Sequence, residues 1–190
     1  TAHGMAVLVE GNYRPRPTLL HGLRYHLKTR QRNIPLHTPH LEYHTTHHLR
    51  WQLRSETPQR FWQVALDVAA AHRQTRSRPT WGGMCSARLR QPIGRGVHLQ
   101  AFAGAFLTAD YATRLYAYLP QLPGVGAFPM FSGRGCSLAL VGRWDYSPRF
   151  RLAFRWGWTR YFDRTTIGQG TQQIAAPQQH DTAFSLRYRF

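Results

Sequence analysis

The sequence predicts an all-β protein, an antiparallel up-and-down β-barrel that spans a membrane. Three observations favour this fold class. Long segments alternate apolar and polar residues with a period of two, as strands do when one face meets an apolar phase. No apolar run approaches the roughly 20 residues that a membrane-spanning helix requires. Few segments have the periodicity of an amphipathic helix, so the apolar strand faces have no evident partner in the chain.

The last forty residues carry the clearest alternation. Two strands, near 150–162 and 184–190, each place aromatic and aliphatic side chains on one face. We expect this face to contact lipid: Phe150, Leu152, Phe154, Trp156, Trp158, Phe184, Leu186, Tyr188 and Phe190. Arginines occupy the alternate positions here and in earlier strands, where they would face a wet lumen or contact anions. These arginines are Arg50, Arg54, Arg88, Arg90, Arg143, Arg151, Arg155, Arg187 and Arg189.

The other elements follow in order along the chain. We expect strands at residues 5–13, 19–28, 49–54, 62–70, 81–91, 97–108, 114–119, 127–131 and 137–145. A polar connection rich in proline and histidine is expected at 29–46. Short turns would lie on the periplasmic side of a barrel and the long loop at 163–181 outside. The short turns are expected at 14–17, 55–60, 92–96 and 146–149.

The strand count predicts that these residues belong to a larger barrel. The expected topology makes residues 114–132 cross the membrane twice, which gives about 11–12 strands in total. The crossings number about eleven, whereas single-chain bacterial barrels normally have an even count. We therefore expect residues 1–190 to form a single β-barrel domain that is the C-terminal part of a longer protein.

The charge of the chain leaves alternatives open. Lysine and arginine total 25 against 8 acidic residues, for a net charge of +17. A soluble, arginine-rich β protein that binds RNA or DNA is one alternative, because such a charge attracts polyanions. An anion-selective porin is another, because rings of arginine favour anions in a pore. The leading expectation is an integral outer-membrane barrel, and the missing strand suggests that it serves as a structural or accessory subunit of an envelope complex.

Catalytic and cofactor signals are sparse. The carboxylates are scattered and no serine stands in a nucleophile elbow, so we expect no enzymatic activity, no catalytic residues and no cofactor. His40, Glu42 and His44 would share one face of a strand, and imidazole with carboxylate suits a divalent metal. The alternative is a solvated segment in a histidine-rich chain. Cys85 and Cys136 both fall on apolar faces, which does not suggest a disulfide.

The C-terminal part of the sequence resembles a family of bacterial outer-membrane barrel proteins whose members often carry helix-hairpin-helix repeats ahead of the barrel. The resemblance lies in Arg114-Leu-Tyr-Ala-Tyr118, Phe131-Ser-Gly-Arg-Gly135, Arg155-Trp-Gly-Trp-Thr-Arg-Tyr161, Asp163-Arg164, Ile167-Gly-Gln-Gly170 and Leu186-Arg-Tyr-Arg-Phe190. It implies a barrel in the outer membrane. For such a barrel we expect outer-membrane lipid, lipopolysaccharide and other envelope proteins as partners. Leu122-Pro-Gly-Val-Gly126 imitates the hairpin of those repeats, but Pro120 and Pro129 leave no room for flanking helices.

Overall fold

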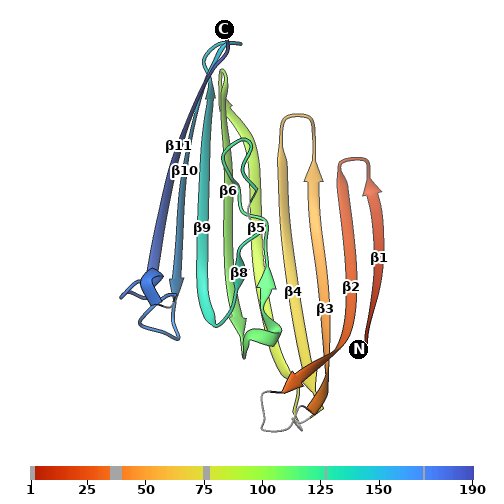
Figure 1. The fold of residues 1–190 in the computed structure, drawn as a ribbon. Helices are drawn as coiled ribbons and strands as arrows, with labels where there is room; N and C mark the ends of the chain where they lie inside the picture. Colours follow the sequence, from red (N-terminus) through yellow and green to blue (C-terminus); the bar gives the residue numbers. More distant parts are fainter. Residues whose placement is uncertain (1–2, 35–39, 75–77, 127, 169) are drawn as a thin grey trace.

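A computed structural model describes residues 3–34, 40–74, 78–126, 128–168 and 170–190, and it is all-β over these residues. One nine-stranded antiparallel sheet has the order β1-β2-β3-β4-β5-β6-β9-β10-β11, which confirms the predicted up-and-down arrangement (Figure 1). Its strands are β1 (Gly4–Arg16), β2 (Leu19–Ile34), β3 (His40–Glu56), β4 (Phe61–Arg73), β5 (Thr80–Gly94), β6 (Val97–Thr108), β9 (Arg134–Asp145), β10 (Phe150–Tyr161) and β11 (Gln178–Tyr188). Among the described residues, no helix is long and apolar enough to cross a bilayer.

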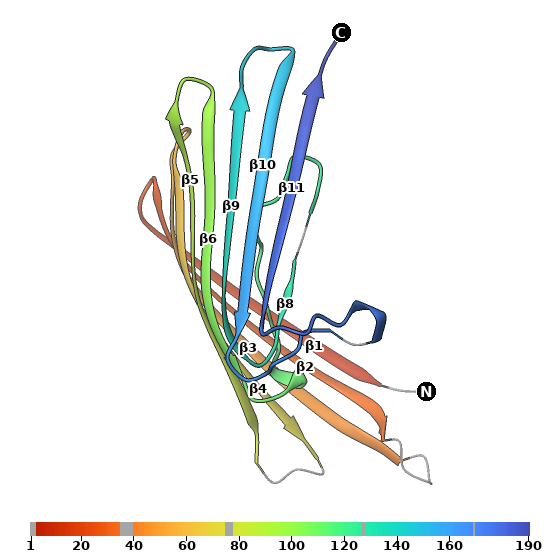
Figure 2. The ribbon, with the colours of Figure 1, turned by 90° about the vertical axis from the view of Figure 1, so that its left-hand side faces the viewer.

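The sheet has two chemically different faces. Directly paired residues of antiparallel strands share a face, so the register extends each strand's alternation to its neighbours. Leu49, Val68 and Gly83 lie on one face in adjacent strands, for example, and Arg50 and Asp67 lie on the other. The sheet is strongly curved, and residues 109–126 and 128–133 lie within its concave side (Figure 2). We call these residues the inner segment, the sheet face that they cover the inner face, and the opposite face the outer face.

The inner segment replaces two strands that the sequence was expected to send across the membrane. It contains the 3-10 helix η1 (Tyr111–Thr113) and two short strands, β7 (Leu115–Tyr116) and β8 (Met130–Phe131), which pair only with each other. The expectation that this stretch crosses twice was therefore wrong. The turns before and after this stretch lie on the expected sides whenever the stretch crosses the membrane an even number of times. Zero crossings satisfy that condition as well as two do. Pro120, Pro123 and Pro129 lack the N–H that a sheet ladder needs.

The buried core lies between the inner face and the inner segment. Its buried side chains are Ala69, Met84, Phe102, Phe106 and Ala139 from the sheet and Leu115, Ala117, Leu119 and Phe131 from the inner segment. Gly82 allows the closest approach, because a Cβ at this position would lie 2.7 Å from the carbonyl oxygen of Thr113. Thr113 itself is fully buried. The inner segment therefore completes the hydrophobic core.

Strand lengths at the N-terminal side differ from expectation. β2 and β3 pair continuously from Leu19↔Ser55 to Ile34↔His40, so most of the expected connection at 29–46 is strand. Backbone pairing does not require apolar side chains, and the polar residues there continue the ladder without a sequence signal. The short turns lie together at one end of the sheet, as expected, and the strand ends that lead into the other connections lie at the opposite end (Figure 1). The last connection is shorter than expected, because β11 already begins at Gln178.

Candidate functional site

The arginines expected to face a lumen lie on the inner face. Arg50, Arg54, Arg88, Arg90, Arg143, Arg151, Arg155 and Arg187 all occupy inner-face positions of the large sheet, and Arg189 follows the same alternation just beyond β11. Their surroundings differ. Arg155 is buried, whereas Arg90, Arg187 and Arg189 are exposed. The inner face therefore combines one buried and several half-buried arginines with others that are exposed to solvent.

Three arginines hold the inner segment by donating to its backbone carbonyls. Arg50 donates from Nη2 to the Tyr116 oxygen at 2.9 Å, and Arg155 donates from Nε to the Pro120 oxygen at 3.1 Å. Arg164, in the loop after β10, donates from Nη2 to the Ser132 oxygen at 2.9 Å. Arginine suits this task because its guanidinium offers several donors in a fixed plane. Sequence reasoning did not assign this role to any of the three residues.

Inner-face arginines also contact several of the carboxylates. Arg50 Nε lies 2.5 Å from Asp67 Oδ1, and Arg155 pairs with Asp181 across the β10–β11 ladder. At the short-turn end, Arg143 Nη2 lies 3.1 Å from Asp145 Oδ2, and Arg151 contacts the other oxygen of the same carboxylate. Some of the predicted anion-contacting arginines are therefore already neutralised by side chains of this protein.

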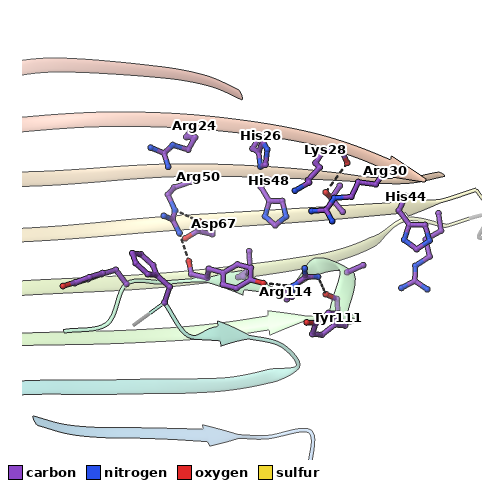
Figure 3. A pocket seen from close by; sticks show the side chains of 17 residues that line it. Arg24, His26, Lys28, Arg30, His44, His48, Arg50, Asp67, Tyr111 and Arg114 are labelled. Atoms are coloured by element: carbon purple, nitrogen blue, oxygen red, sulfur yellow. Dashed lines mark hydrogen bonds and ion pairs between the residues drawn. The ribbon is translucent and has the colours of Figure 1, made fainter. Parts of the chain in front are cut away.

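A hollow of about 560 Å³ opens between the inner face and the start of the inner segment (Figure 3). We call it the cationic hollow. It is lined by Arg24, His26, Lys28 and Arg30 of β2, by His44, Thr46, His48 and Arg50 of β3, by Asp67 and Arg73 of β4, and by Tyr111, Ala112, Arg114, Leu115, Tyr116, Tyr118 and Phe128. Of the predicted arginines only Arg50 lies here. The other lining residues were not predicted from the sequence. The alternation of Arg24, His26 and Lys28 with apolar residues could have indicated that these three share the inner face.

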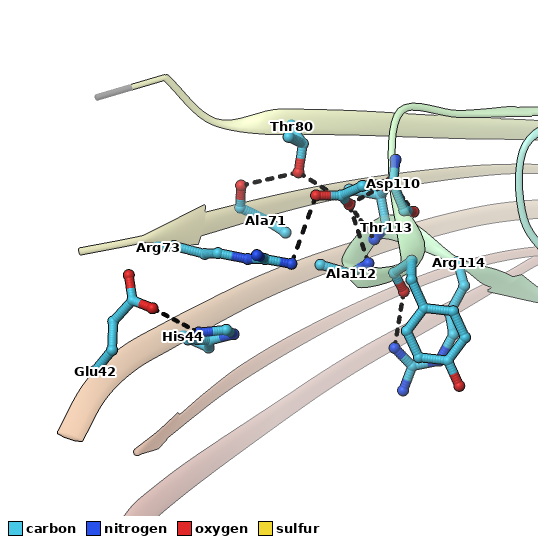
Figure 4. A network of polar contacts seen from close by, with 10 residues as sticks. Glu42, His44, Ala71, Arg73, Thr80, Asp110, Ala112, Thr113 and Arg114 are labelled. Carbon is cyan, nitrogen blue, oxygen red and sulfur yellow. Dashed lines mark hydrogen bonds and ion pairs between the residues drawn. The ribbon is translucent and has the colours of Figure 1, made fainter. Parts of the chain in front are cut away.

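Two of the three residues proposed for a metal site, Glu42 and His44, lie at the edge of this region (Figure 4). His44 Nε2 and Glu42 Oε2 are 3.0 Å apart, while the side chain of His40 lies outside the described residues. Within the described part of the chain, no group of three or more His, Cys, Asp or Glu side chains is arranged to hold a metal ion. Nearby, Asp110 caps η1 by accepting from the backbone N–H groups of Ala112 and Thr113, and Arg73 lies 3.8 Å from its carboxylate.

Asp163 and Arg164, in the loop after β10, form another group of polar contacts. Burial acts to raise the pKa of Asp163. Hydrogen bonds from Arg164 and from the Arg134 backbone, together with the Arg164 charge, outweigh that effect, so its pKa lies below the usual value. Arg164 also stacks on Tyr161 with its guanidinium carbon 4.3 Å from the ring centre. Asp163 and Arg164 are among the residues that carry the family resemblance. In the structure, Arg164 attaches the loop to the inner segment and Asp163 binds Arg164.

The residues expected to contact lipid lie on the outer face. Phe150, Leu152, Phe154, Trp156 and Trp158 pair there with outer-face residues of β9 and β11. Phe184, Leu186 and Tyr188 continue the surface on β11, with Phe184 67% exposed, and Phe190 lies beyond the strand. Cys85 and Cys136 are also outer-face residues and are not disulfide-bonded.

Comparisons with protein-family models, with curated proteins and with solved structures yield no match to this chain.

Proposed function

We propose that this protein is an integral β-barrel protein of the bacterial outer membrane, with its outer face against lipid hydrocarbon and its inner face toward water. One observation carries the proposal: large apolar side chains are exposed on the outer face across the whole sheet. Leu23, Leu49, Leu66, Leu89, Leu107, Leu140, Phe154 and Leu186 are all in this class. In an aqueous protein so large an apolar surface would favour aggregation, whereas in a bilayer it is solvated by lipid.

The dimensions of the apolar surface support this assignment. On three strands of the sheet, β4, β5 and β10, the outer-face apolar residues run from Trp62 to Ala70, from Trp81 to Leu89 and from Phe150 to Trp158. Each run is about nine residues long, close to the 9–11 residues with which a tilted strand crosses a bilayer. Tryptophans mark both ends of the surface, as expected where indole rings lie at the interface with water. Trp62 and Trp144 are at the short-turn end, and Trp81 and Trp158 are at the other.

The register is consistent with tilted strands. Direct pairing connects Trp62, Leu89, Ala101, Leu140 and Trp156 across five consecutive strands. In β4 the connected residue, Trp62, lies at the short-turn edge of the apolar surface. In β9 the connected residue, Leu140, lies near the centre of that surface, and in β10 Trp156 lies toward its opposite edge. Paired positions therefore drift along the apolar surface from strand to strand, as they do when strands tilt relative to a barrel axis.

Membrane insertion requires the backbone groups at the sheet edges to be paired. β1 and β11 are the edge strands of the described sheet. Unpaired N–H and C=O groups are costly in hydrocarbon, so we propose that these strands pair with each other or through further strands to close a barrel. Lipopolysaccharide would contact the rim. The resemblance of the C-terminal motifs to outer-membrane barrels suggests an accessory role in an envelope complex.

An anion-selective conduit is a second candidate, and the cationic hollow favours it. Conductance in a planar bilayer, with reversal potentials measured in a salt gradient, would test it. A current carried mainly by chloride supports the conduit. An electrically silent bilayer contradicts it and leaves the accessory role.

Membrane localisation can be tested directly. The chain, expressed with a secretion signal in a Gram-negative host, should fractionate with the outer membrane, resist extraction by high salt and need detergent for release. A folded barrel should also migrate faster on a gel before heating than after it. If the chain is released by high salt and elutes with nucleic acid, the proposal fails and the polyanion-binding alternative takes its place.

A further inference from the structure

We infer that the cationic hollow is a binding site for a small molecule that carries two or more phosphate or sulfate groups on a sugar-sized scaffold. The hollow opens on the inner face, so this inference does not depend on whether the outer face contacts lipid.

Two like charges face each other across the β2–β3 ladder, because Arg24 is paired directly with Arg50. Histidines lie beside them on the same face, with His26 opposite His48 and Arg30 opposite His44. Cationic side chains placed opposite one another destabilise an antiparallel sheet, because their Cβ atoms are only about 5 Å apart. A bound polyanion would reduce the repulsion between the two arginines.

Only some of these cations are neutralised within the protein. Arg24 is paired with Glu10 at 2.8 Å, Arg50 with Asp67 at 2.5 Å, and Arg73 lies 3.8 Å from Asp110. These pairs lie around the hollow. No ion pair is recorded within the described chain for Lys28, Arg30 or Arg114, all of which line the hollow. Figure 3 shows Lys28 and Arg30 on β2 and Arg114 across from them on the inner segment.

Arg114 is held in place before any ligand binds. Its Nε donates to the Tyr116 hydroxyl at 2.8 Å and its Nη1 donates to the Tyr111 carbonyl at 2.9 Å. The guanidinium carbon lies 4.4 Å from the centre of the Tyr111 ring. Two of its five N–H donors are used in these contacts, which leaves three for a ligand. A pre-oriented guanidinium loses little entropy on binding and matches the geometry of a tetrahedral oxyanion.

Spacing and wall composition indicate the ligand class. Alternate residues on a strand are about 7 Å apart, so Lys28 and Arg30 can contact two separate anionic groups of one molecule. A volume of about 560 Å³ falls within the range of small-molecule sites. The opposite wall carries exposed rings of Tyr111, Tyr116 and Phe128, which can pack against the apolar face of a sugar ring.

Calorimetric titration of the full chain in detergent micelles tests the site. The probes are a glucose bisphosphate, inorganic pyrophosphate, sodium sulfate and a single-stranded oligonucleotide. The double variant Lys28→Gln/Arg30→Gln removes two unpaired cations, and Arg114→Lys keeps the charge but removes the planar fork. Arg54→Gln/Arg187→Gln is the matched control, because it removes two inner-face cations that do not line the hollow. Circular dichroism checks that each variant folds.

We expect the glucose bisphosphate to bind more tightly than pyrophosphate or sulfate. The affinity should fall at least about tenfold in Lys28→Gln/Arg30→Gln and in Arg114→Lys, because each change removes charge-assisted hydrogen bonds. The control should change it less than about threefold, the effect of a distant screened charge. Equal losses in the control, or binding by the oligonucleotide alone, would overturn the inference. Membrane fractionation of the same variants should be unchanged, so failure here is distinct from failure of the membrane assignment.

Discussion

Replacing Phe154 with arginine tests whether the outer face meets lipid or water. Phe154 lies near the middle of β10 on the outer face, between Gly142 and Phe184 in the ladder, and its side chain is 49% exposed. Because half of the ring is already exposed, the packing lost on truncation is limited to roughly 1–2 kcal/mol. An arginine at the bilayer midplane adds a further cost of about 2–4 kcal/mol, whereas an exposed arginine in water adds almost nothing.

Depth dependence provides the control. Ile93 is also an exposed apolar residue, at 59%, but it lies at the register shift near the short-turn end of β5. In a membrane, arginine there should cost only about 0–1 kcal/mol. Alanine variants at both positions measure the loss of packing, and subtracting them leaves the cost of the charge.

The assay is urea unfolding in lipid vesicles, followed by tryptophan fluorescence and by gel migration without heating. We expect Phe154→Arg to be less stable than Phe154→Ala by about 2 kcal/mol or more, and Ile93→Arg to be within about 1 kcal/mol of Ile93→Ala. Small, equal differences at the two positions would refute lipid contact, because an aqueous surface has no depth.

Three further predictions concern the inner segment and its supports. Arg50→Gln should lower the free energy of unfolding by roughly 1–3 kcal/mol, since it leaves the buried Asp67 without its partner, and adding Asp67→Asn should restore part of the loss, as measured by urea unfolding. Gly82→Ala should lower the free energy of unfolding by about 1–3 kcal/mol, because the added methyl group pushes the inner segment away from the sheet. Gly142→Ala should be neutral, because there is open space around a Cβ at that position. Equal effects of the two substitutions would contradict the close approach at Gly82. The lowered pKa of Asp163 stabilises the fold above the unfolded value of about 3.9 and ceases to do so as pH falls through the folded value. The wild type should therefore exceed Asp163→Asn in stability by less than about 1 kcal/mol at neutral pH and converge with it in acid, and a difference that persists in acid would count against this pair.

The alternation of side chains was sufficient to predict the class of fold. Trp62 to Ala70 and Phe150 to Trp158 are strands with one apolar face, and the structure confirms an all-β, antiparallel up-and-down sheet. This succeeded because the two-residue repeat is a local property of each strand, independent of which strand lies beside it. Closure of the sheet and its contact with lipid stay predictions.

Local patterns failed where two different structures fit the same sequence. Residues 114–119 alternate as a strand does, yet only Leu115 and Tyr116 form a short one, on the inner face and outside the large sheet. Conversely, residues 29–34 and 40–46 are mostly polar and were expected to lie in a connection, yet they are paired in β2 and β3. Backbone hydrogen bonding and the space beneath a curved sheet decided these cases, and neither is visible in side-chain periodicity.

Side-chain alternation along each strand is enough to place the arginines and the apolar residues on opposite faces. Which cations share a site follows from the way the strands and the inner segment pack together. Lys28 and Arg30 share the inner face of β2, and they meet Arg114 because the register of β2, β3 and β4 places them where the inner segment folds back. Register and fold-back depend on contacts between residues far apart in the chain. A cation at one position therefore carries no information about which of the others it will meet.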